Sequence, residues 1–130
     1  MAGGTTTVRT TNASNSWSLS FNERKRLKYL HLSYTSTATA GNRQIRIGIK
    51  DSSGNVVWDS HAGAVQAASL TYHYFVLPGI YRETSFIDSE IQVPIPVDTI
   101  IDGNHSLFVD DDAAVAAGDS MVIGYQLEDI

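Results

Sequence analysis

The stretch RQIRIGIKDSSGNVVW, residues 43–58, decides the fold class of this chain. Isoleucine recurs at every second position from 45 to 49, and this period of two predicts a strand with one buried face. The turn-forming residues 51–55 separate that strand from a second apolar run, so the stretch predicts a β-hairpin. On this pattern Ile47→Asp is expected to unfold the protein, whereas Arg46→Asp, on the other face, is expected to have little effect on folding.

The same alternation recurs along the chain, with a register slip expected near Tyr29. Helix signals are few, and residues 61–69 predict a loop or a short helix. About eight strands at a spacing of about 10–15 residues predict an all-β, antiparallel β-sandwich that is jelly-roll-like, with an immunoglobulin-like topology as the other choice. The further alternating segments are 17–21, 30–34, 70–76, 91–95, 107–109 and 121–127.

The domain organisation follows from where the alternation begins. Residues 1–14 are small and polar and predict a flexible N-terminal arm or a strand lent to a neighbour, and residues 15–130 predict a single β-sandwich domain. Pro94 and Pro96 lack backbone donors and place their segment at a sheet edge or in a crossover. Asp102-Gly103 predicts a tight hairpin turn.

Composition excludes several classes of protein. The chain of 130 residues has no cysteine, which excludes a disulfide scaffold, a thiolate metal site and a cysteine nucleophile. Its net charge of −5 argues against specific nucleic-acid binding, because such affinity comes mainly from neutralised phosphates. No apolar run predicts a signal peptide or a membrane span, so synthesis and folding in a cytoplasm are expected.

Aspartates cluster near the C-terminus, in HSLFVDDDAAVAAGDS, residues 105–120. Neighbouring residues of an extended chain point to opposite sides, so Asp110 and Asp112 can share a face that Asp119 joins across the loop. The first interpretation is a solvated strand end, and a Ca²⁺ site at Asp110, Asp112 and Asp119 is the second. Asparagine at all three positions is therefore expected to leave folding unchanged.

No motif predicts catalysis, and the chain is expected not to be an enzyme and to need no cofactor. Gly-Asp-Ser at 118–120 matches part of a lipase-type nucleophile block, but no histidine follows it. The four histidines lack metal-ligand spacing. Trp17 shares a face with core residues, whereas Trp58 at the end of the hairpin is the better candidate for an exposed contact.

The order of four segments resembles a family of phage proteins. These are RIGIKDSSGNVVWDS (46–60), YHYFVLPG (72–79), IQVPIPVDTIIDGNHSLFVDD (91–111) and DSMVIGYQLED (119–129), which follow a polar start. This pattern resembles the capsid decoration, or cement, proteins of tailed bacteriophages, small β-sandwich proteins with a jelly-roll fold. The family has no fixed set of active residues to transfer to this sequence.

The resemblance implies a virion structural protein that binds and stabilises the outer surface of a phage head. The implied partners are the major capsid protein and neighbouring copies of the chain. The implied assembly is a homo-oligomer, for which a trimer is one candidate because capsids offer threefold positions. Alternatives are a carbohydrate- or receptor-binding module of a phage fibre, a tail or neck adaptor, and a small hydrolase. Edge strands and arms often make contacts, so the candidate contact residues are Val8, Arg9, Trp58, Pro94 and Pro96.

Overall fold

The computed structural model describes residues 4–130, and in that range the chain forms ten β-strands and no helix. Accordingly, these residues contain no helix long and apolar enough to cross a membrane. The predicted all-β class is confirmed. The strands are β1 (Thr5–Asn12), β2 (Ser16–Ser20), β3 (Lys25–Thr35), β4 (Ile45–Lys50), β5 (Val56–His61), β6 (Thr71–Pro78), β7 (Glu90–Ile95), β8 (Ile100–Ile101), β9 (Ser106–Asp111) and β10 (Ser120–Asp129).

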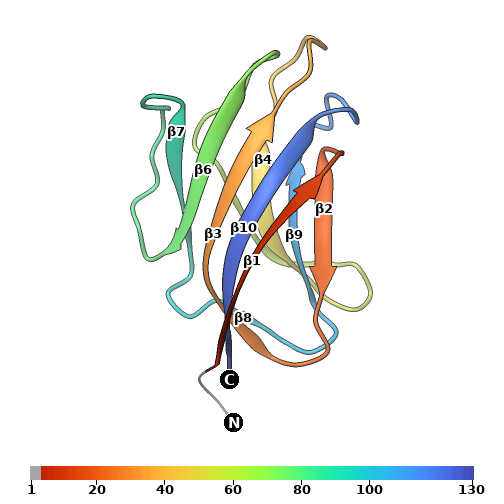
Figure 1. Cartoon of the computed structure of the whole chain (residues 1–130), viewed down its shortest axis with the longest axis vertical. Helices are drawn as coiled ribbons and strands as arrows, with labels where there is room; N and C mark the ends of the chain where they lie inside the picture. The colour runs from red at the N-terminus through yellow and green to blue at the C-terminus, as the bar shows by residue number, and fades with distance from the viewer. Residues whose placement is uncertain (1–3) are drawn as a thin grey trace.

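The strands form two facing sheets with jelly-roll connectivity. One sheet has the order β1-β10-β3-β6-β7, with the short β8 paired to β3, and the other has the order β2-β9-β4-β5. Figure 1 shows β1, β10 and β3 side by side in front of the second sheet. Along the chain, β1, β3 and β6 enter the first sheet and β2, β4 and β5 enter the second. Strands β9 and β10 then return beside β2 and β1, which is the double Greek key of a jelly roll. This order excludes the immunoglobulin-like alternative.

The alternating residues fill the space between the sheets as predicted. Ile45, Ile47 and Ile49 are buried on β4, and Leu30 and Leu32 face them from β3. Gly48 lies on the outer face of β4, where a Cβ would come within 2.4 Å of the Trp58 carbonyl oxygen and 2.8 Å of the Phe108 ring. The outer face of this strand is therefore also closely packed.

Two local predictions of strand geometry are confirmed. The register of β3 against β10 shifts between Leu27 and Tyr29, so Lys28 is the extra residue of a β-bulge where the slip was expected. The bulge lets Leu27 and Leu30 both face the core although they are three residues apart. The segment with Pro94 is an edge strand, because β7 ends its sheet and pairs only with β6, in parallel.

Two other predictions are corrected. Thr5–Asn12, expected in a flexible arm, form β1 and pair with β10 along their whole length; residues 1–3 lie outside the described range. An edge strand needs few apolar residues, and the β-branched threonines suit it. The Asp102-Gly103 segment is a turn closed by the His105 N–H and the Asp102 carbonyl, but it links β8 of one sheet to β9 of the other instead of closing a hairpin.

Candidate protein-binding surface

The three neighbouring aspartates at the end of β9 point to different sides. Asp110 and Asp112 share the outer face, where Arg46 makes a two-pronged contact with Asp110 (Nε–Oδ1 3.0 Å, Nη2–Oδ2 2.8 Å) and lies 3.5 Å from Asp112. Asp111 points inward. Its carboxylate accepts hydrogen bonds from the backbone N–H groups of Gln44, Ala113 and Val115, and these bonds close the loop that follows β9. The outer pair is thus already held by a cation.

Asp119 lies in a separate, fully buried cluster. Its Oδ2 accepts hydrogen bonds from Arg43 Nε (2.9 Å) and the Tyr34 hydroxyl (2.8 Å), and its Oδ1 accepts Arg43 Nη2 (3.1 Å) and the Thr37 N–H (2.8 Å). Neither Arg43 nor Asp119 has any exposed side-chain surface. Arg43 also donates to the carbonyls of Thr39 and residue 41, so the cluster ties the β3–β4 loop to the start of β10.

The charges in this cluster are stabilised by their partners. Burial alone would raise the pKa of Asp119, but the hydrogen bonds from Arg43, the Thr37 N–H and Tyr34 outweigh it and hold that pKa below its ordinary value. Burial and the bond to Asp119 raise the pKa of the Tyr34 hydroxyl far above its ordinary value, so Tyr34 remains a donor. Asp119 is therefore a structural carboxylate whose oxygens are already occupied.

The structure does not bring the three residues of the candidate Ca²⁺ site together. Asp110 and Asp112 face solvent beside Arg46, and Asp119 is enclosed with Arg43. Within residues 4–130, no three side chains of the ligand-forming types make a group that would hold a metal. A Ca²⁺ ion needs six to eight oxygen ligands, and bonds to arginine already occupy the oxygens of Asp110 and Asp119.

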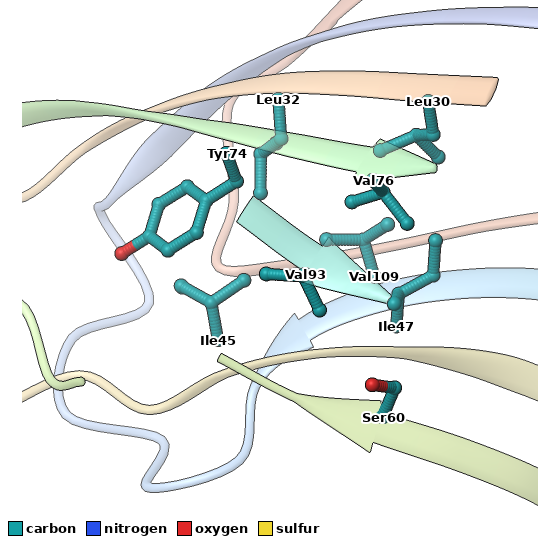
Figure 2. Close-up of a pocket in the computed structure, with 9 residues that line it drawn as sticks. All are labelled: Leu30, Leu32, Ile45, Ile47, Ser60, Tyr74, Val76, Val93 and Val109. Carbon is teal, nitrogen blue, oxygen red and sulfur yellow. The ribbon is translucent and has the colours of Figure 1, made fainter. Parts of the chain in front are cut away.

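The interior between the two sheets is closely packed in the region that Figure 2 shows. The cavity there is about 10 Å³, roughly the space of one water molecule. Apolar side chains from both sheets line this cavity. Ser60 and Tyr74 are the two lining residues that carry a hydroxyl group. This interior region has no room for a substrate, so a partner or ligand would have to bind at the surface.

Most of the large exposed apolar side chains belong to the edge strand β5 and to the loops that flank β5 and β7. We define the β5–β7 side as β5, β7 and the flanking loops 62–70, 79–89 and 96–99; β5 and β7 contact each other across the gap between the sheets. Six of the seven large exposed apolar side chains of residues 4–130 belong to it, and Tyr81 (81%) and Val97 (75%) are the most exposed. The six are Val56, Val57, Val65, Tyr81, Ile87 and Val97.

The loop between β6 and β7 is held in place by hydrogen bonds. Arg82 donates to the Ser60 hydroxyl on β5 (2.9 Å), and Glu83 accepts the Gln92 N–H of β7 (2.8 Å). Ile87 and Glu90 exchange both backbone hydrogen bonds around two residues with positive φ, which is the geometry of a type I′ turn. The loop therefore presents Tyr81 and Ile87 from an ordered backbone.

The predicted contact residues divide between two opposite edges. Trp58, Pro94 and Pro96 belong to the β5–β7 side, although Trp58 is half-buried and packs against the core. Val8 and Arg9 lie on β1, at the other end of the same sheet as β7. The contact residues predicted from the sequence do not include Tyr81, Ile87 or Val97, because loop positions have no periodicity that distinguishes exposed from buried apolar residues.

Neither a protein-family model nor a curated protein matches the sequence. Similar solved structures include an arabinose-bound GH51 α-L-arabinofuranosidase (14% identity, TM-score 0.45), with 98% of this chain and 18% of the enzyme covered. The turnip yellow mosaic virus structure (7% identity, TM-score 0.33) matches over 99% of this chain and 82% of the viral chain. Infectious bursal disease virus VP2 (12% identity, TM-score 0.28) matches over 98% of this chain and 39% of the VP2 chain. A jelly roll hosts many unrelated functions, so these likenesses assign none.

Proposed function

We propose that this chain is a virion structural protein, a capsid decoration protein that docks on the outer surface of a phage head through its β5–β7 side. The observation that carries the proposal is the concentration of six of the seven large exposed apolar side chains on that side. Exposed apolar residues held on a rigid framework are typical of protein-binding surfaces, and aromatic residues such as Tyr81 often contribute most of the binding energy.

The remaining features suit a cement role. The buried Arg43–Asp119 cluster holds the β3–β4 loop and hydrogen bonds hold the β6–β7 loop, so little entropy is lost when the surface docks. A decoration protein needs no chemistry, and we propose that the purified chain hydrolyses no esters, glycosides or phosphodiesters. The partner is the major capsid protein, and the same contacts would suit a tail or neck adaptor if the particle carries it there.

A pair of charge-adding variants tests the docking surface. Val97→Asp adds a negative charge to an exposed apolar position of the β5–β7 side, and it is expected to weaken binding to heads assembled without this chain by about tenfold. Ser18→Asp adds the same charge at an exposed position of β2, at the opposite edge of the sheet from β5, and should change binding by less than about twofold. Binding is measured by co-sedimentation at increasing protein concentration.

Folding serves as the internal control in this comparison. Both side chains are exposed, so the melting temperatures of the two variants should equal that of the unmodified chain. Equal binding by Val97→Asp and Ser18→Asp would exclude the β5–β7 side as the docking surface.

Carbohydrate binding is the second candidate, and the exposed ring of Tyr81 is the observation that favours it. Aromatic faces stack on sugar rings, and Tyr81 is far more accessible than the half-buried Trp58. A glycan array separates the two functions: binding that Tyr81→Ala abolishes would favour a receptor-binding role, whereas binding to heads and not to glycans supports decoration.

A further inference from the structure

Strand β1 is an edge without the usual protection against pairing. It runs for eight residues with no proline, no bulge and a single charged side chain, Arg9. In residues 4–130, no other strand lies on its outer side. Exposed edges of this kind pair with further strands unless proline, charge, a bulge or a covering loop prevents it.

The outward-facing backbone groups of β1 follow from its register. The Gly4 carbonyl accepts the Asp129 N–H (2.8 Å), and Gly4 stands opposite Asp129 in the continued register of β1 and β10. Hydrogen-bonded pairs alternate along an antiparallel ladder, so the even-numbered residues of β1 bond to β10. The N–H and C=O groups of Thr5, Thr7, Arg9 and Thr11 therefore point away from the sheet.

The other three sheet edges within residues 4–130 are protected. In β7, Pro94 lacks a donor, and both backbone groups of Gln92 bond to Glu83 of the neighbouring loop. A register shift at Ile49 and Lys50 distorts the start of β5. Strand β2 has only five residues, and the Asn12 side chain bonds to the Ser16 carbonyl at its start (2.8 Å). Among these four edges, β1 is the one with a long run of unprotected backbone groups.

We propose that β1 pairs antiparallel with β1 of a second copy of this chain, across a twofold axis at Val8. In this register Thr7 faces Arg9 of the other copy, and Thr5 faces Thr11. The two β-sheets then join into one, and the N-terminal strand becomes the centre of a dimer. The contact lies at the opposite end of the sheet from β7 and does not depend on the proposed capsid docking.

Geometry and charge select this register over its neighbours. A twofold axis at Val8 lets all four outward-facing residues pair with one another, whereas a shift of one residue in either direction leaves some of them unpaired. A shift of the axis to Arg9 would also place two like charges directly opposite, which is destabilising. Threonine–threonine and valine–valine pairs are favourable across strands. A twofold contact makes a dimer, not the trimer that capsid symmetry suggested.

A single introduced cysteine tests the register, because the chain contains no other cysteine. Val8 would face Val8 of the second copy in a non-hydrogen-bonded pair, where Cα atoms lie about 4.5 Å apart, within the range of a disulfide. Under mild oxidation Val8→Cys is therefore expected to convert most of the protein to covalent dimer. Thr6→Cys and Thr10→Cys should crosslink poorly alone but readily when mixed, because position 6 faces position 10.

A proline variant tests the pairing without a crosslink. Thr7→Pro removes an outward-facing N–H and leaves the bonds of β1 to β10 in place, so sedimentation should shift from dimer to monomer with little change in melting temperature. Efficient crosslinking of Thr6→Cys alone, a Thr7→Pro protein that is still dimeric, or an unmodified protein that stays monomeric or forms trimers at high concentration would each overturn the proposal.

Discussion

Replacing Asp119 by asparagine is expected to lower the free energy of unfolding by about 3–5 kcal/mol, a large share of the total of about 5–15 kcal/mol, which corrects the expectation from sequence that folding would be unchanged. The substitution keeps the size of the side chain but leaves the guanidinium of Arg43 buried, with no exposed surface and without the carboxylate that binds it. Denaturant unfolding measures the loss. Asp112→Asn is the matched control: Asp112 is 45% exposed, and its removal should cost less than about 1 kcal/mol.

Acid pH provides an independent check on the same pair. The pKa of Asp119 in the folded protein lies below its ordinary value of 3.8, so the stability that its charge contributes is present above pH 3.8 and is lost as the pH falls through the folded pKa. The free energy of unfolding should thus decrease steeply below about pH 4 in the unmodified chain and less steeply in Asp119→Asn. Parallel slopes for the two proteins would show that Asp119 is not held charged by Arg43.

Ile47→Asp is expected to unfold the protein or nearly so. Ile47 is 2% exposed, and the substitution both removes its packing and buries a charge with no partner. The combined cost of at least about 5 kcal/mol is comparable to the whole stability of a small domain. Loss of the β-rich circular dichroism signal at 25 °C would be the readout, and a cooperative melt close to that of the unmodified chain would show that the faces of β4 are wrongly assigned.

The neighbouring substitution, Arg46→Asp, is no longer expected to be harmless. Arg46 is only 18% exposed, binds Asp110 at 2.8 Å and lies 5.0 Å from the centre of the Phe108 ring. An aspartate there would face Asp110, Asp112 and Asp59 with no cation between them. We expect a loss of about 1–3 kcal/mol in denaturant unfolding, smaller than that of Ile47→Asp, and Arg46→Lys should retain most of the stability.

Local patterns in the sequence were sufficient to predict the fold class. Isoleucine at every second position of β4 predicts the buried face correctly, because side chains alternate along any strand whatever its partners. The turn residues after Lys50 and the edge position of Pro94 follow from equally local chemistry. The jelly-roll order is less local, and the sequence left an immunoglobulin-like arrangement open.

Contacts between distant residues could not be predicted. Arg43 and Asp119 are 76 residues apart in the chain, and no pattern in either segment predicts that they meet in the interior. Nearness in sequence therefore groups Asp119 with Asp110 and Asp112. Strand β1 is hard to predict for a different reason: an edge strand buries so little apolar surface that its sequence resembles that of a polar arm.

The most direct test of the central claim is a binding isotherm of the purified chain on phage heads that lack it, with the bound protein quantified against the major capsid protein. A decoration protein occupies one repeated lattice site, so binding should saturate at a fixed ratio set by the symmetry of the shell. Decorated heads should then withstand higher temperature than bare heads. Binding that does not saturate, or heads whose thermal resistance is unchanged at saturation, would contradict the proposed function.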